Sequence, residues 1–105
     1  MDNNVKIKFR IVSEKTLKEF CEDHADATAA VQEWTTKVKA AEWNQFADIK
    51  QTFNTVDYVK NDRYVFNIRG NDYRIVALIL FKPKLLYIRF IGTHAEYNEI
   101  DCSTI

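Results

Sequence analysis

Apolar and charged side chains alternate along residues 5–12, VKIKFRIV, so that nearly every second residue is apolar. A period of two places the apolar side chains on one face of an extended chain, as in a strand with one buried face. We therefore predict a strand over residues 5–12. Beyond it the apolar spacing changes to three and four residues, which is typical of helices.

Three helical segments are predicted between the first strand and residue 53. Ser13 is the expected N-cap of the first segment, and Asp26 is the expected N-cap of the second. The apolar stripe of the first helix comprises Leu17, Phe20, Cys21 and His24. The stripe of the second comprises Ala30, Val31, Trp34, Val38 and Ala41. A short third helical turn with Phe46, Ile49 and Phe53 is expected after a break at Trp43 and Asn44.

The second half of the chain has an extended pattern, with β-rich runs at residues 64–69, 73–81 and 85–91. Their joints contain Gly70-Asn71 and Pro83-Lys84, which suit tight turns. A short helical turn capped by Thr93 is expected over residues 93–100. The 105 residues thus predict one α+β domain with an N-terminal strand, two to three helices packed on an antiparallel β-meander, and a short C-terminal helix.

Two-residue turns at these joints fix a predicted strand register. Asn67 then lies opposite Arg74, Arg69 opposite Asp72, Leu78 opposite Arg89, and Leu80 opposite Tyr87. One face of the sheet is expected to be core, formed by Phe66, Ile75, Ile79, Ile88 and Phe90. The other face carries Asn67, Arg74, Tyr87 and Arg89 among aliphatic residues.

The net charge is zero, but the charge is distributed unevenly. Residues 63–94 contain six basic residues, four of them arginines, against one acidic residue, Asp72. The planar guanidinium of arginine binds phosphate through paired charged hydrogen bonds. By charge alone, this segment is as well explained by a solvated surface as by a phosphate-binding one. For Arg74, an ion pair with Asp72 or with an acidic residue of the C-terminal turn is the alternative to phosphate binding.

His94 and Tyr97 follow the last strand and lie three residues apart, on one side of the expected helical turn. Imidazole is the usual proton-transfer group near neutral pH, although an isolated histidine more often has a structural role. His24 is interpreted as structural, because it belongs to an apolar stripe. Cys21 and His24 lack the second ligand pair of a zinc site, and no glycine-rich phosphate loop or nucleophile motif is present.

No apolar run is long enough to span a bilayer, and residues 1–6 do not resemble the start of a signal peptide. The two cysteines do not suggest a disulfide framework. We therefore expect a cytoplasmic protein without a membrane partner.

Two motifs carry a family resemblance. Residues 61–76, NDRYVFNIRGNDYRIV, and residues 88–101, IRFIGTHAEYNEID, resemble signatures of the HigB-type mRNA interferase toxins of type II toxin–antitoxin systems, within the RelE-like superfamily. Residues 11–20 and the break at residues 41–43 are also similar, so the resemblance covers nearly the whole chain.

The resemblance implies a RelE-like fold and an endoribonuclease that cleaves translated mRNA, usually on the ribosome. It further implies metal-independent attack of the 2′-OH on its own phosphate, with no cofactor, and a HigA-type helix-turn-helix antitoxin, through which alone operator DNA would be bound. A non-catalytic RelE-fold module that binds RNA or a protein is the alternative, as is a domain whose basic strands only dock an acidic antitoxin segment.

Carried onto this sequence, the resemblance implies a role for each candidate residue. Arg74 would be the main phosphate stabiliser, and His94 and Tyr97 would transfer protons or orient substrate. The RNA- and phosphate-binding residues would be Asn67, Arg69, Asn71 and Arg89. Asn98 replaces an acidic residue of the family motif, so no carboxylate is assigned a role there.

Overall fold

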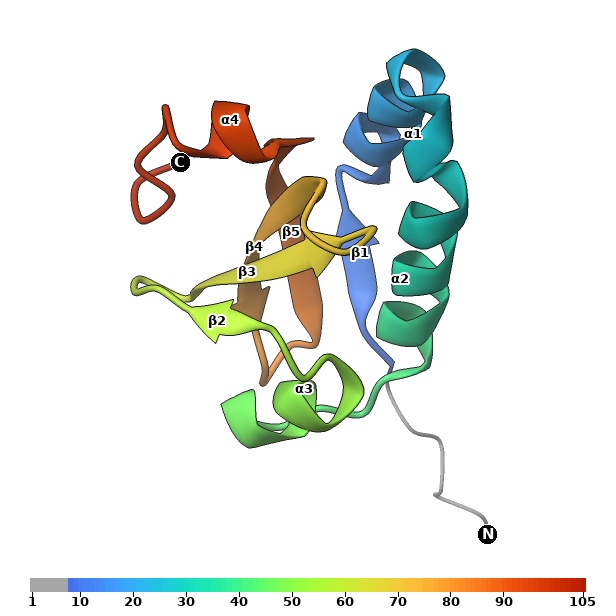
Figure 1. Cartoon of the computed structure of the whole chain (residues 1–105). Coiled ribbons are helices and arrows are strands. Elements are labelled where there is room, and N and C mark those ends of the chain that lie inside the picture. Colours follow the sequence, from blue (N-terminus) through green and yellow to red (C-terminus); the bar gives the residue numbers. More distant parts are fainter. Residues whose placement is uncertain (1–7) are drawn as a thin grey trace, which may run out of the picture.

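The computed structural model describes residues 8–105, which form a five-stranded sheet with helices on both sides (Figure 1). The strands are β1 (Arg10–Val12), β2 (Asp57–Tyr58), β3 (Arg63–Ile68), β4 (Tyr73–Leu80) and β5 (Leu85–Thr93). The helices are α1 (Glu14–Asp23), α2 (Thr28–Ala40), α3 (Phe46–Thr52) and α4 (His94–Tyr97), with a 3-10 turn (η1, Ala25–Ala27) between α1 and α2.

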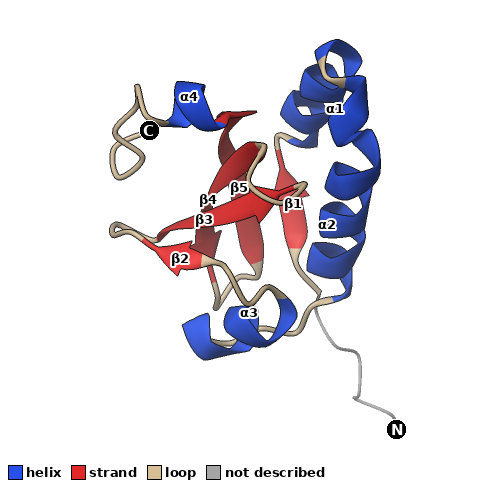
Figure 2. Cartoon of the chain, viewed as in Figure 1, coloured by secondary structure: helices blue, strands red, loops and turns tan. Residues whose placement is uncertain are grey.

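The strand order is β1-β5-β4-β3-β2, and β3, β4 and β5 form the expected antiparallel meander. β1 adds to this meander in parallel beside β5, and the very short β2, which the sequence did not predict, pairs with β3. Figure 2 shows α1 and α2 along one side of the sheet and α4 with the C-terminal segment on the other. The α+β architecture expected for a RelE-like fold is therefore confirmed.

The core lies between the sheet and α1, α2 and α3. Four residues of the predicted core face are buried there, namely Phe66, Ile75, Ile79 and Ile88. From the helices, Leu17, Val31, Trp34, Val38 and Ile49 pack against them. Burial of these large side chains is the main force that joins the helices to the sheet.

The first hairpin has the predicted register, with Asn67 opposite Arg74. Its turn differs in detail, because Arg69 and Gly70, rather than Gly70 and Asn71, have positive φ angles. The register predicted for the second hairpin is wrong: Leu78 lies opposite Tyr87, and Leu80 opposite Leu85. The turn over residues 81–84 is closed by a hydrogen bond from the Lys84 N–H to the Phe81 carbonyl, so its central residues are Lys82 and Pro83 rather than Pro83 and Lys84. Moving the centre of the turn by one residue shifts the pairing by two, which preserves the face on which each side chain lies.

A β-bulge in β5 changes the facing beyond that point. Ala77 pairs with Ile88 and Val76 pairs with Phe90, so Arg89 is the extra residue without a partner on β4. Phe90 consequently lies on the face opposite the core, and its predicted place in the core is wrong. Arg89 is exposed at the bulge.

Of the two predicted helix caps, Ser13 does occupy the N-cap position of α1, although its side chain does not cap, and the prediction for Asp26 is wrong. Ser13 precedes α1 with a φ of 71° and makes no side-chain capping bond. Asp26 lies inside η1, where its carboxylate accepts a hydrogen bond from Tyr73 instead of capping α2. The third helical segment and the Thr93 cap are confirmed. Of the first predicted strand, residues 10–12 are extended in β1 and residues 5–7 lie outside the described part.

Candidate functional site

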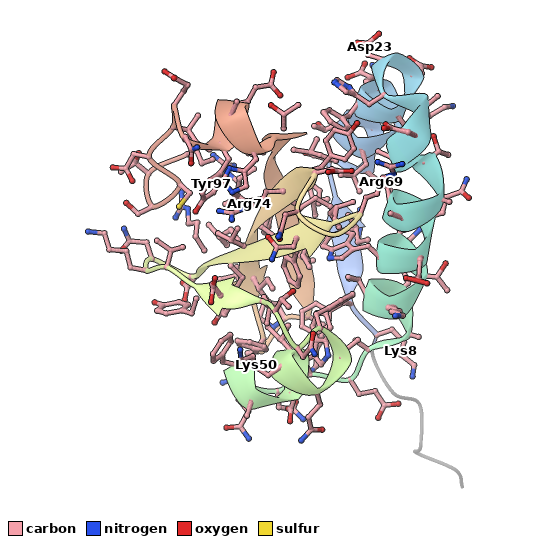
Figure 3. All side chains as sticks on the ribbon, in the orientation of Figure 1. Lys8, Asp23, Lys50, Arg69, Arg74 and Tyr97 are labelled. Carbon is pink, nitrogen blue, oxygen red and sulfur yellow. The ribbon has the colours of Figure 1, made fainter. Side chains whose placement is uncertain are left out.

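Arg74 and Tyr97 meet on the sheet face that α1 and α2 leave uncovered. Arg74 comes from β4 and is half-buried, and Tyr97 ends α4. The guanidinium carbon of Arg74 lies 4.6 Å from the centre of the Tyr97 ring, a cation–π arrangement. Figure 3 shows both side chains between the sheet and the C-terminal segment. The ring therefore holds the guanidinium without neutralising its charge.

No carboxylate of residues 8–105 forms an ion pair with Arg74. Asp72, the partner considered from the sequence, instead contacts Arg69 at 2.5 Å. The ion-pair interpretation of Arg74 is thus wrong for the described residues. Its Nε is buried with no hydrogen-bond partner. A half-buried guanidinium without a carboxylate partner is suited to binding an anion through its other donors.

Gly92 makes room beside this pair. It is the residue of β5 that lies opposite Arg74, and it is buried. A Cβ at this position would lie 2.5 Å from Cζ of Phe90 and 2.8 Å from Oε1 of Glu96. The absence of a side chain thus lets the Phe90 ring pack across β5 toward Tyr97, whose ring centre is 6.5 Å away.

A capping box sets the start of α4. The Thr93 backbone N–H donates to Oε1 of Glu96 at 2.8 Å, and the Glu96 N–H donates to Oγ1 of Thr93 at 3.1 Å. His94 is the first residue of α4 and is exposed. Its Nδ1 lies 3.4 Å from Nδ2 of Asn98. The cap thereby places His94 and Tyr97 on the same short helix beside Arg74.

The Tyr97 hydroxyl lies in an environment that keeps it protonated. Burial is the largest cause that raises the pKa of Tyr97, and a hydrogen-bonding contact with the Cys102 thiol, at 3.4 Å, raises it further. The positive charge of Arg74 acts in the opposite direction, but the net pKa remains above the usual tyrosine value. At neutral pH the hydroxyl is therefore a proton donor.

The other sequence-predicted RNA-binding residues are more scattered. Asn67 lies opposite Arg74 and is half-buried, so the structure brings these two together. Asn71 is exposed in the β3–β4 turn, and Arg89 is exposed at the bulge. Neither is joined to Arg74 by a polar contact within residues 8–105.

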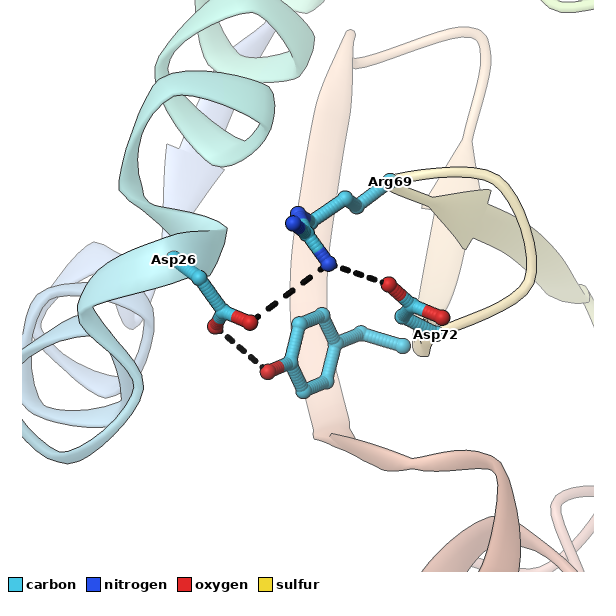
Figure 4. Close-up of polar contacts among 4 residues, drawn as sticks. Asp26, Arg69 and Asp72 are labelled. Atoms are coloured by element: carbon cyan, nitrogen blue, oxygen red, sulfur yellow. Dashed lines mark hydrogen bonds and ion pairs between the residues drawn. The ribbon is translucent and has the colours of Figure 1, made fainter.

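Arg69 lies apart from Arg74, beside α2 (Figure 3). Its Nη1 is 3.5 Å from Oδ2 of Asp26 and 2.5 Å from Oδ2 of Asp72, and Tyr73 donates to Oδ1 of Asp26 at 2.6 Å (Figure 4). Two carboxylates therefore compensate the charge of Arg69, which ties the β3–β4 turn to η1.

His24 has the structural surroundings expected from its apolar stripe. Its ring stacks on Phe20 with 4.0 Å between centres, and its Nδ1 contacts the Phe20 carbonyl at 3.2 Å. Across residues 8–105, no three His, Cys, Asp or Glu side chains are grouped so that they could hold a metal ion. In the same part of the chain, no helix is long and apolar enough to cross a membrane.

Sequence reasoning missed Cys102 and Gly92 as members of this site. A glycine inside a strand, opposite an arginine, is a signal of close packing that could have identified Gly92. Cys102 gave no such signal, because its contact with Tyr97 depends on how the chain folds back after α4.

The sequence is similar to a known protein family and to several named proteins. Residues 27–100 match a family described as "HigB_toxin, RelE-like toxic component of a toxin-antitoxin system". The mRNA interferase toxin HigB of Escherichia coli strain K12 is 28% identical over 90 residues, which cover 84% of this chain and 86% of that protein. The mRNA interferase HigB of Shigella flexneri is equally similar, and that of Escherichia coli O6:H1 is 25% identical over 92 residues, covering 86% of this chain and 89% of that protein.

Proposed function

This chain belongs to the HigB family of RelE-like toxins, and on that premise we propose that it is an endoribonuclease that cleaves translated mRNA. As the toxic component of a toxin–antitoxin system it has an antitoxin partner, which we propose to be a HigA-type helix-turn-helix protein. The observation that carries the proposal is Arg74, a half-buried guanidinium that is stacked on Tyr97 and has no carboxylate partner within residues 8–105.

The proposed reaction is internal transesterification of RNA. The 2′ oxygen attacks the adjacent phosphorus, the bond from phosphorus to the 5′ oxygen breaks, and the products are a 2′,3′-cyclic phosphate and a 5′-hydroxyl. One proton leaves the 2′-OH and one reaches the departing 5′ oxygen. Negative charge accumulates on the phosphorane oxygens between these events, so a fixed positive charge beside them lowers the barrier.

Arg74 is the residue proposed to supply this positive charge. Its stacking on Tyr97 fixes the plane of its hydrogen-bond donors. Tyr97 is protonated at neutral pH, as tyrosines ordinarily are, and its raised pKa disfavours the phenolate further, so it serves as a hydrogen-bond or proton donor rather than as a base. His94, exposed at the start of α4, is the proposed partner in proton transfer. None of these roles requires a metal ion, and we propose a metal-independent reaction.

We also propose that the ribosome supplies most of the docking energy for the message. The chain has no net charge, and Arg69 is compensated by two carboxylates. A protein that bound RNA tightly by itself would need several uncompensated phosphate contacts. A cytoplasmic location follows from this proposal, because translated messages are found there.

The decisive experiment maps the 5′ ends of cellular messages after brief induction of the toxin without its antitoxin. Wild type is expected to produce new 5′ ends within coding regions and to stop growth. Arg74→Ala is expected to lose about a hundredfold in cleavage, because one preorganised donor group at the developing charge is removed. Arg74→Lys should retain only part of the activity, since an ammonium keeps the charge but not the flat, stacked donor set.

Arg10→Ala is the matched control, because it removes one positive charge from an exposed position on β1. It should cleave and arrest growth as wild type does. If Arg74→Ala and His94→Ala both remained fully toxic, the catalytic assignment would be wrong. If wild type itself left messages intact, a non-catalytic binding module would be the correct interpretation.

A further inference from the structure

The chain after α4 folds back toward the β2–β3 turn, and its contacts are side chain to backbone. Asn61 donates from Nδ2 to the Ser103 carbonyl at 3.1 Å, and Arg63 donates from Nε to the main-chain oxygen of Ile105 at 3.0 Å. A second guanidinium nitrogen of Arg63, Nη2, donates to the same oxygen of Ile105. These contacts link residues 42 positions apart in the sequence. We call residues 101–105, together with Asn61 and Arg63, the C-terminal clamp.

The backbone of the β2–β3 turn directs Asn61 and Arg63 toward the C-terminal segment. Asn61 and Asp62 have φ angles of 54° and 63°, as in the tight hairpin turns that match the twist of paired strands. Arg63 also donates from Nη1 to the Asn61 carbonyl at 2.9 Å, so the two clamp residues hold each other. The turn thus presents two donors toward the C-terminal segment.

The segment itself is ordered locally by Asp101. The Asp101 carboxylate accepts hydrogen bonds from the backbone N–H of Ser103 at 3.0 Å and from its hydroxyl at 2.7 Å, and these bonds lower the pKa of Asp101. Within residues 8–105, Ser103 is the only polar or charged residue, other than tyrosine and tryptophan, that is buried. Cys102 is therefore held between two fixed neighbours.

Cys102 contacts the Tyr97 hydroxyl at 3.4 Å, and Tyr97 in turn stacks on Arg74. We propose that the C-terminal clamp is a positioning element of the catalytic site, in which Asn61 and Arg63 hold Cys102 against Tyr97 and so fix the ring on which the Arg74 guanidinium rests. The inference rests on the proposed function for its effect on cleavage, but the positioning itself can be measured without RNA.

The physical reason is the short length of α4. A helix of four residues, His94–Tyr97, has little stability of its own, so contacts outside it must fix its last side chain. If Tyr97 lost Cys102, its ring could rotate away, and Arg74 would lose both its aromatic partner and its fixed plane. Small misplacements of a charge-stabilising group reduce cleavage strongly, because its hydrogen bonds must be aligned before the reaction begins.

The test combines four variants with two measurements. Arg63→Met and Asn61→Ala release the segment, Cys102→Ala removes the contact with Tyr97, and Cys102→Ser replaces the thiol by a hydroxyl that can keep it. Arg10→Met is the charge-matched control for Arg63→Met. The first measurement is the pKa of the Tyr97 phenol, taken from NMR titration of ring-labelled tyrosine and assigned with Tyr97→Phe. The second is the rate of message cleavage by purified toxin on programmed ribosomes.

We expect Arg63→Met, Asn61→Ala and Cys102→Ala to lower the pKa of Tyr97 toward the usual tyrosine value, because burial and the Cys102 contact both raise it. The same three variants should cleave about tenfold more slowly, as expected for a group displaced from its aligned position. Cys102→Ser should keep the Tyr97 pKa and the cleavage rate near those of wild type, and Arg10→Met should match wild type in both. Circular dichroism checks that each variant is folded.

An unchanged Tyr97 pKa in folded Arg63→Met and Cys102→Ala would overturn the positioning. A lowered pKa with an undiminished cleavage rate would overturn its link to catalysis. If wild type did not cleave RNA at all, the proposed function would fail, while the tyrosine titration would still decide whether the clamp positions Tyr97.

Discussion

Gly92 on β5 lies directly opposite Arg74 on β4, and the space that its missing side chain leaves is filled by the Phe90 ring and the Glu96 carboxylate. Phe90 reaches this position because the bulge at Arg89 moves it to the open face of the sheet. The local irregularity of β5 and the glycine that follows it therefore shape the surroundings of the arginine on the neighbouring strand.

Gly92→Ala should slow cleavage clearly while lowering the free energy of unfolding only slightly. The added methyl group would lie 2.5 Å from Cζ of Phe90, so the ring must move away from Tyr97. We expect destabilisation of about 1 kcal/mol, the lower end for overpacking, because flexible side chains can yield. Cleavage should fall about tenfold. Chemical denaturation and cleavage assays on the same preparation measure both, and wild-type cleavage by a folded variant would contradict the packing argument.

Arg74→Ala should reduce the salt dependence of RNA binding. Each lost phosphate contact lowers the slope of log affinity against log salt concentration by about one. The measurement is fluorescence anisotropy with a single-stranded 2′-O-methyl RNA, which cannot undergo 2′-OH attack. Arg10→Ala, with the same change in net charge, should keep the wild-type slope. Equal slopes for all three proteins would show that Arg74 contacts no phosphate in the bound state.

Arg69→Ala should be far less damaging than Arg74→Ala. The charge of Arg69 is already compensated by Asp26 and Asp72, and exposed ion pairs of this kind contribute little to stability. We expect growth arrest and message cleavage within about twofold of wild type, since a compensated charge attracts phosphate weakly. A loss as large as that of Arg74→Ala would place Arg69 in the substrate site after all.

Tyr73→Phe should change the stability of the protein in a pH-dependent way. The hydrogen bond to Asp26 is the largest cause that raises the pKa of Tyr73, because ionised Tyr73 could not donate it. A raised folded-state pKa means that the bond stabilises the fold below the ordinary tyrosine pKa of about 10 and is lost as the pH rises through the folded value. The difference in unfolding free energy between wild type and Tyr73→Phe should be constant near neutral pH and shrink at alkaline pH. A difference independent of pH would exclude this hydrogen bond as its source.

Much of the sheet could be predicted from the sequence because its pattern is local. The alternation of residues 64–69 and 73–81, together with the short joint at Gly70, was enough to place Asn67 opposite Arg74. The Thr93 cap and the helical turn after it were equally visible, since a capping box depends on residues three positions apart. The register predicted for the second hairpin was wrong because the turn is centred on Lys82 and Pro83, one residue earlier than the expected Pro83 and Lys84.

The features missed in the site are those that depend on distant contacts. Asp26 looked like a helix cap, but Tyr73 and Arg69, more than forty residues away, take its carboxylate. The pairing of Asp72 with Arg69, by contrast, is local, because the two residues are three positions apart and the predicted turn places them opposite each other. The bulge at Arg89 is invisible to a period of two, because one extra residue changes the facing of all that follow.

The sequence by itself determined the order of the elements and the core face of the sheet. It also placed Arg74 on β4, and His94 and Tyr97 on the helical turn that follows β5. Those features follow from periodicity and local hydrogen bonding, which act over a few residues. Only the tertiary structure decided that Arg74 stacks on Tyr97, that Arg69 is compensated, and that Asn61 and Arg63 hold the segment with Cys102. Such pairings depend on which surfaces the packed core brings together, and no local pattern encodes that choice.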